Sequence, residues 1–481
     1  MILSEVPDSV LVDLGRTGAG PDTLALLVRD QDTRRLLVLR AVLEAAEEAP
    51  PRLCSAEQKA RLREDWALLA EADRRTATGD PAPPAPARAR LLYPLTGAWG
   101  WRCLRGLTGG SDPSPAGEAR RVRRLARDLA HFSALAAAVA VRAGVPFAVR
   151  LTAYDGELVL PSLGALHTAE RSDTEIEARF DAERLTLGQP LAPDVGVHPE
   201  HGFGAWSGSL AWTSAYALPG LLPGTAAMPL DDLDPYRTVR DPRHSALSGP
   251  TTLDNAERKH WLHTWSGTAA ALRSGGEHRV TEAMTLLRCL VPLASPPGST
   301  ASGHGSCSAT RREAFGALLS SAPPDPVTFA ATLVHELHHA KLAALSDMTP
   351  LHRSSPAETH FAPWRPDPRP YDGLLQGAYS HLAIADYYQR RALAPDTVHR
   401  EPAWAQHARY RVQVGAVLPA LVASPDLTVR GRRFVDEMVA AYERMGAHPA
   451  SRGHTARAQA YVNAARTLWR QRHTFARRPN E

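Results

Sequence analysis

Two histidines four residues apart, His335 and His339, are the feature that most constrains this chain. They lie in TLVHELHHAKLAALSDM, residues 332–348, and enclose Glu336 in an H-E-x-x-H pattern. On an α-helix, residues four apart lie on one face, one turn above the other. Two neutral imidazoles placed in this way can reach one metal ion at about 2.0–2.1 Å. The pattern therefore predicts a metal site on a helix, with Glu336 beside it.

The surrounding sequence favours a helix at this place. Asp325 is suited to cap the amino end, and Pro326 to fill the first helical position, where its missing N–H costs nothing. No glycine or proline follows until Pro350. The preceding EAFGALLSS is typical of a short strand. His338 is interpreted as a residue that supports the site from outside the metal or lies at the surface.

The third protein ligand is left open by the residues alone. A zinc-peptidase pattern with a third histidine is excluded, because AKLAALSD follows His339. Asp347 lies on the same helix about 12 Å further along the axis, too far to reach the ion easily. Asp386 lies on the next helix, and Asp367 in the loop FAPWRPDPRP. The other downstream carboxylates are Glu358 and Asp372.

The loop FAPWRPDPRP is unusual for a simple connection. Its four prolines fix φ and stiffen the chain, and it carries Arg365, Asp367 and Arg369. A rigid loop with two guanidiniums suits the binding of a carboxylate ligand. A structural Arg–Asp clasp explains the same residues equally well. In the helix that follows, Gly373 and Gly377 are expected to let a neighbour pack closely, with the H-E-x-x-H helix as the candidate.

The organisation of the chain is predicted from its patterns. With 44% hydrophobic and 22% charged residues, the 481-residue chain is globular. We expect a helical region over 1–75, a Pro/Ala-rich linker or loop over 76–93, a mixed α/β region with a candidate peptide-binding role over 94–291, and a mostly helical metal-site region over 292–481. Asp155 and Gly156 predict a hairpin turn between two strands.

Composition excludes some classes of partner. A formal net charge of +4 gives no electrostatic case for nucleic acid. We find no signal peptide, no apolar stretch long enough for a membrane span, and no C-x-x-C among the four cysteines. We therefore expect a cytoplasmic protein with reduced thiols.

Two stretches together resemble a known family. LVHELHHAKLAALSD followed by HFAPWRPDPRPYDGLLQGAYSHLA resembles the H-E-x-x-H proteins that modify ribosomally synthesised peptides. The likeness is strongest over residues 292–388. Some members carry a radical S-adenosylmethionine domain, and this chain resembles the standalone form. The combination of helix and loop is more specific than H-E-x-x-H alone.

The resemblance implies an Fe(II)- and 2-oxoglutarate-dependent oxygenase that hydroxylates the β-carbon of a residue in a precursor peptide. It implies a mainly helical α+β fold, with the H-E-x-x-H helix packed against later helices and a small antiparallel sheet, and not a cupin-type barrel. His335 and His339 are then iron ligands, with Asp367 as the carboxylate and Asp386 and Asp347 as alternatives. Arg365 or Arg369 would hold the co-substrate. Gln376, where a histidine is equally expected, is included as a cofactor-site residue.

The partners and the alternatives follow from this interpretation. The expected partner is a precursor peptide, with neither nucleic acid nor membrane, and a homodimer is a candidate assembly. The alternative is a zinc metallopeptidase, in which Glu336 acts as general base towards a zinc-bound water. A peptide-binding protein with a structural metal is a third hypothesis, against which the open third ligand position argues, because structural sites are closed by four ligands.

Overall fold

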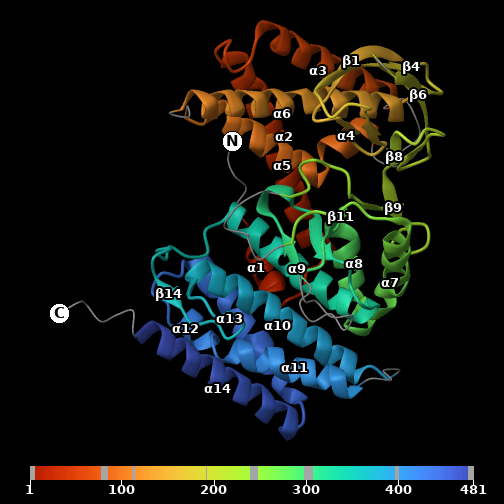
Figure 1. The fold of residues 1–481 in the computed structure, drawn as a ribbon. Coiled ribbons are helices and arrows are strands. Elements are labelled where there is room, and N and C mark those ends of the chain that lie inside the picture. Colours follow the sequence, from red (N-terminus) through yellow and green to blue (C-terminus); the bar gives the residue numbers. More distant parts are fainter. Residues whose placement is uncertain are drawn as a thin grey trace.

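The chain is mainly helical with several small sheets. The computed structural model describes residues 6–76, 85–110, 114–190, 192–238, 248–296, 307–395 and 400–474. Over these ranges no sheet closes into a barrel, which confirms the expected mainly helical α+β class. Figure 1 shows the amino-terminal helices and small sheets at one end, and the carboxy-terminal helices at the other. None of the described helices is long and apolar enough to cross a membrane.

The amino-terminal helices build one hydrophobic core. They are α1 (Asp8–Gly15), α2 (Pro21–Glu48), α3 (Ala56–Thr76), α4 (Pro86–Leu91), α5 (Pro94–Thr108) and α6 (Pro115–Arg142). Helices α2, α3, α5 and α6 enclose a cluster that contains Val42, Leu69, Trp99 and Phe132. Helix α4 lies within the predicted linker over 76–93, so the second half of that segment is folded structure. Its first half, residues 77–84, lies outside the described residues.

Two antiparallel sheets pack on the apolar half of α6. The first has the order β1 (Phe147–Ala153), β4 (Thr174–Phe180), β5 (Leu185–Gln189), β6 (Ala192–Pro199) and β7 (Ala205–Trp206). The second contains β2 (Glu157–Leu160), β3 (Gly164–His167) and β8 (Trp212–Ser214). Strand β4 alternates buried and exposed side chains, the period-two pattern of a sheet with one face on a core.

The predicted hairpin around Asp155 and Gly156 is present only as a turn. Both residues have positive φ, 54° and 84°, as a tight turn requires. The flanking strands nevertheless diverge, because β1 pairs with β4 and β2 pairs with β3. A single bridge between Tyr154 and Glu157 joins them. The local turn was predictable, whereas the pairing of each strand is decided by distant segments.

A mixed sheet lies beside the H-E-x-x-H helix. Its order is β12 (Ser308–Thr310), β13 (Ala317–Ser321), β11 (Cys289–Leu293), β10 (Met228–Leu230) and β9 (Tyr216–Leu218). Strand β11 pairs in parallel with both β10 and β13, so this sheet is not purely antiparallel as expected. The segment predicted as a strand before the helix is β13, which confirms that prediction.

The remaining elements surround this sheet. They are α7 (Asn255–Ser274), α8 (Glu277–Leu286), the 3-10 helix η2 (Arg312–Ala314), α9 (Pro326–Met348), β14 (Thr359–His360), β15 (Arg369–Pro370), α10 (Tyr371–Leu393), α11 (Arg400–Gly415), α12 (Leu418–Val422), α13 (Val429–Arg444), the 3-10 helix η3 (Met445–Ala447) and α14 (Arg452–Thr474). Helix α9 contacts α7 on one side and α10 on another. One core cluster joins α1 with α7 to α10 and α13, and the boundary predicted after residue 291 falls inside β11.

Asp65 is expected to make stability depend on pH. It is 3% exposed between Arg61 at 3.4 Å and Ser133 at 2.5 Å, and burial raises its pKa to about 6. Between about pH 4 and 6, Asp65 keeps its proton in the folded chain but has lost it in the unfolded chain. The free energy of unfolding therefore falls as pH rises through this range. Asparagine does not titrate, so the stability of Asp65→Asn lacks this pH dependence. Relative to wild type, its free energy of unfolding should therefore rise by about 2–3 kcal/mol from pH 4 to pH 7. Chemical denaturation of both proteins at pH 4 and pH 7 checks this. The same difference in unfolding free energy at the two pH values would contradict it.

Candidate metal centre

Helix α9 places the two motif histidines against each other. Asp325 caps the helix by accepting the backbone N–H groups of Val327 and Thr328 at 2.8 and 2.9 Å, and Pro326 fills the first position, as predicted. The Nε2 atoms of His335 and His339 are 3.1 Å apart, with their rings nearly perpendicular. Two nitrogens that bind one metal at about 2.0–2.1 Å lie about 2.9–3.4 Å apart. The pair is therefore spaced for a shared ion.

Gln376 fixes the orientation of His339. Its Oε1 lies 3.1 Å from His339 Nδ1, and an amide oxygen there accepts the Nδ1–H proton. This tautomer leaves the lone pair of Nε2 directed at His335. Metal-binding histidines are commonly held by such an outer partner. The structure thus brings Gln376, a predicted site residue, to the motif from the neighbouring helix α10.

His381 on α10 joins the two motif histidines. Its ring centre lies 5.5 Å from that of His335, and it is 8% exposed. Neither ring nitrogen has a hydrogen bond to another described residue, and Nδ1 is buried. Burial first, and then the charge of His339, lowers the pKa of His381 to about 3, so its imidazole is neutral. A neutral imidazole with an unused nitrogen is a metal-ligand form.

His335 shares this environment. Burial, followed by the charges of His339 and His381, holds its pKa well below the usual range. Its Nδ1 is buried and has no hydrogen-bond partner. His381 is thus a third imidazole near the motif pair, and sequence reasoning did not foresee it. The available signal was an isolated histidine in the apolar stretch SHLAIA of α10.

Glu336 lies on the sheet side of the pair. It is 3% exposed, and its Oε1 accepts a hydrogen bond from Ser308 of β12 at 2.8 Å. The same oxygen is 4.0 Å from His335 Nε2. Burial raises the pKa of Glu336, although His339, Ser308 and Thr310 oppose the shift. The carboxyl group is therefore adjacent to the histidines, and burial favours its protonated form.

The predicted carboxylate ligands are all engaged elsewhere. Asp367 is 44% exposed and lies between Arg365 at 3.0 Å and Arg369 at 3.4 Å. Asp386 pairs with Arg279 and Arg390, and Asp347 pairs with Arg312. Within the described ranges, no group of three or more His, Cys, Asp or Glu side chains meets the geometry of a metal cluster. Neither the predicted set of His335, His339 and Asp367 nor a set with His381 in place of the aspartate is spaced to hold an ion in the structure.

The proline-rich loop forms the Arg–Asp clasp and contacts the site through Trp364. The Trp364 ring meets that of His381 at 4.5 Å between centres. It also lies where a side chain at Gly377 would be, since a Cβ there would come within 2.5 Å of the ring. A Cβ at Gly373 would meet Arg369. The two glycines thus admit this loop, and the expectation that they admit the H-E-x-x-H helix is wrong.

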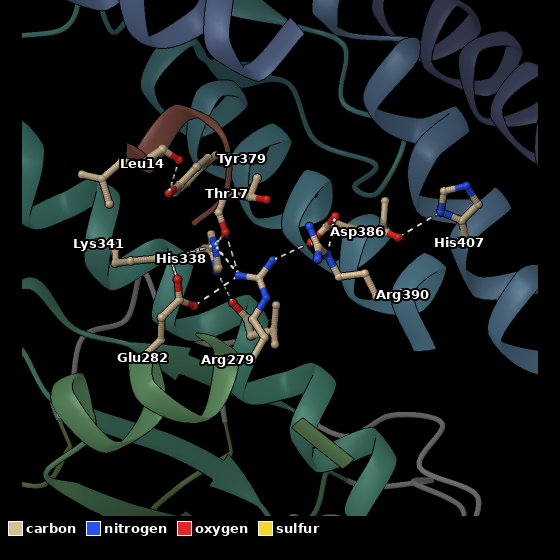
Figure 2. Close-up of polar contacts among 12 residues, drawn as sticks. Leu14, Thr17, Arg279, Glu282, His338, Lys341, Tyr379, Asp386, Arg390 and His407 are labelled. Atoms are coloured by element: carbon tan, nitrogen blue, oxygen red, sulfur yellow. Dashed lines mark hydrogen bonds and ion pairs between the residues drawn. The ribbon is translucent and has the colours of Figure 1, made fainter. Parts of the chain in front are cut away.

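A buried charge cluster supports α9 from the opposite side (Figure 2). His338 is fully buried, so its interpretation as a surface residue is wrong. Its Nδ1 donates to Val334 O at 2.6 Å, and its Nε2 accepts from Lys341 at 2.9 Å. Glu282 of α8 binds Lys341 at 2.8 Å and Arg279 at 3.2 Å. Because Arg279 also binds Asp386 of α10, the cluster joins α8, α9 and α10 behind the histidines.

Comparison with known proteins assigns neither a family nor a function to the chain. No protein-family model matches the chain, and no curated protein is significantly similar to it. The family resemblance therefore depends on the two motifs, and the chemistry depends on the geometry above.

Gln376 gives a test of how the site is oriented. We expect Gln376→Ala to weaken divalent metal binding about 10–100-fold, because His339 loses the acceptor that holds its ring and tautomer. Gln376→Glu keeps an acceptor at the same place and should retain most of the affinity. Competition with a chromogenic chelator measures both. Equal affinities for wild type and the alanine variant would show that Gln376 does not orient a ligand.

Proposed function

We propose that the chain is an Fe(II)- and 2-oxoglutarate-dependent oxygenase that hydroxylates a residue of a ribosomally synthesised precursor peptide. The observation that carries the proposal is the meeting of the two resembling segments at one place. Trp364 of the proline-rich loop packs on His381, and Gln376 of the following helix binds His339. The residues that make the resemblance specific thus surround the motif histidines.

The side chains near the motif offer nitrogen donors of the kind that suit a divalent transition metal. His335 and His381, whose pKa values burial lowers, would hold it together with His339, and Gln376 would orient His339. This donor set replaces the expected carboxylate with a third nitrogen and still leaves coordination positions for other ligands. When bound, iron with 2-oxoglutarate and O₂ supplies the oxidising power for C–H hydroxylation.

The protein's own groups supply orientation and shielding. Trp364 and Tyr410 pack edge-on against His381, with ring centres at 4.5 and 5.1 Å, and keep water from that ring. Glu336 holds a proton or accepts one at Oε1 beside His335. Arg369, predicted to bind 2-oxoglutarate, is 30% exposed and is paired to Asp367. A co-substrate carboxylate would have to share this guanidinium with Asp367.

A zinc peptidase is the second candidate, and Glu336 favours it. A general base works best when its pKa lies near the operating pH, and burial raises the pKa of Glu336 in that direction. Three imidazoles with an adjacent carboxylate also suit a catalytic zinc that keeps one open position. In that case Glu336 would take the proton of the attacking water.

One experiment separates the two. The protein is purified anaerobically, loaded with Fe(II), and supplied with 2-oxoglutarate, O₂ and the precursor peptide encoded beside its gene. The oxygenase proposal predicts succinate and a peptide heavier by one oxygen atom. Peptide cleavage supported by Zn(II), with no succinate, would refute it.

Two variants sharpen the comparison. Glu336→Gln should lower a peptidase rate by about 10²–10⁴-fold, as expected for loss of a general base, and should change hydroxylation far less. Arg369→Ala should weaken 2-oxoglutarate binding in an oxygenase and leave peptide cleavage unaffected. The opposite pattern would favour the peptidase.

A further inference from the structure

A second cavity lies apart from the histidine site. It has a volume of about 740 Å³ and is enclosed by α4, the carboxy end of α6, the segment before β10 and the end of α8. It shares no lining residue with the metal centre described above. Its walls are largely apolar, and include Leu92, Tyr93, Val139, Leu221, Met228 and Met284. This volume lies within the range of about 300–1,000 Å³ that is common for small-molecule sites.

Positive charge gathers on this apolar cavity. Its lining contains four guanidiniums and one carboxylate, Asp32. That carboxylate is already bound, because Arg288 donates to both of its oxygens at 2.7 and 2.9 Å. Arg142 donates to the backbone carbonyls of Ser162, Gly204 and Glu200 and to the Ser162 hydroxyl, so no carboxylate accepts from it there. The other two guanidiniums belong to Arg88 and Arg90.

Arg90 is the residue that points to a ligand. It is 8% exposed, and its guanidinium lies 4.2 Å above the Tyr93 ring. Over the described ranges, its side chain makes no hydrogen bond and no ion pair. Arginine does not lose its proton in proteins, and an unpaired buried charge is costly. A largely apolar cavity that contains such a group is suited to receive an anion.

The acidic groups in the segment after β10 do not form an ion pair with Arg90. Asp231, which follows β10, accepts the Tyr93 hydroxyl at 2.7 Å and the backbone N–H of Asp234 at 3.0 Å. Burial, followed by the charge of Asp231, raises the pKa of Asp234 to about 7. Neither carboxylate lies within ion-pair distance of Arg90. The Arg90 guanidinium thus lines the cavity without an ion pair among the described residues, although its charge acts on Asp234 from a distance.

We propose that this cavity binds a small ligand with an anionic carboxylate or phosphate head group and an apolar body. Arg90 holds the head group through paired N–H donors, the geometry in which guanidinium binds such oxygens best. Tyr93 stacks on one face of the guanidinium and leaves the N–H donors in its plane free to bind. The body lies along Val139, Leu221 and Met228. This site is independent of the proposed oxygenase activity and requires no metal.

Calorimetry with three probes of equal chain length tests the proposal. Decanoate and decyl phosphate carry the two head groups, and decanol carries neither. We expect one or both anions to bind the wild-type chain and decanol to bind much more weakly. The anion that binds more tightly identifies the head group. Absence of binding by both anions, or equal binding of decanol, would overturn the proposal.

Substitutions locate the binding. Arg90→Gln should weaken the anion about 10–100-fold, because a charge-assisted hydrogen-bonding partner is lost. Arg124→Gln, at an exposed position of α6 outside the cavity lining, is the matched control and should leave affinity unchanged. Met284→Trp places a bulkier side chain at the cavity wall without touching the charge, and should also weaken binding. Met284→Trp tests the site if Arg90→Gln does not fold. Unchanged affinity in Met284→Trp and in a folded Arg90→Gln would refute this site.

Discussion

Replacement of His335 by alanine is expected to remove the bound metal. The Nε2 of His335 is 3.1 Å from that of His339, so in the proposed site each would be one of the donors to a shared ion. Loss of a direct ligand should cost more than the about 10–100-fold that follows loss of an outer partner such as Gln376. Metal content by mass spectrometry after dialysis should fall from about one ion per chain to a small fraction.

The control for this prediction is His263→Ala. His263 is exposed on α7, outside the cluster of His335, His339 and His381, and its loss should leave metal content unchanged. Circular dichroism should show both variants folded, because the core of α9 is made by residues such as Leu333 and Leu337. Retention of a full metal equivalent in folded His335→Ala would contradict the site.

Glu282→Ala is expected to lower the free energy of unfolding by about 3–5 kcal/mol. The side chains of Arg279 and Lys341 are completely buried, and Glu282 binds both. Removal of the carboxylate leaves Lys341 buried without its ion-pair partner and Arg279 with Asp386 alone, and removing one partner of a buried pair is strongly destabilising. Burial already lowers the pKa of Lys341 to about 8, which shows how strongly this position disfavours the charge.

Chemical denaturation measures the effect. Glu277→Ala, on the same helix α8, removes a glutamate that is 73% exposed and paired only with Arg273. It should change stability by less than about 1 kcal/mol, as surface ion pairs do. Similar losses in the two variants would contradict the role given to the cluster in Figure 2.

The predictable part of the site was local. Asp325, Pro326 and the apolar spacing define a helix, and the i,i+4 relation places His335 and His339 together whatever surrounds them. Short-range turn chemistry likewise predicted positive φ at Asp155 and Gly156. These features depend on residues within a few positions of one another.

The unpredicted part depends on tertiary packing. His381 comes from α10, and its approach to His335 depends on how α9 and α10 pack. The clasp of Asp367 with Arg365 and Arg369 satisfies the carboxylate that the resemblance favoured as a ligand. Similarly, His338 faces a cluster made by Glu282 and Arg279, which no pattern within α9 reveals.

The central claim is that His335, His339 and His381 together hold one metal ion. X-ray absorption fine structure of the Fe(II)-loaded protein counts the imidazoles at the metal. The account predicts three in the wild type and two in His381→Ala. A wild-type spectrum with two imidazoles and a protein carboxylate, unchanged in His381→Ala, would contradict it and would restore an aspartate as the third ligand.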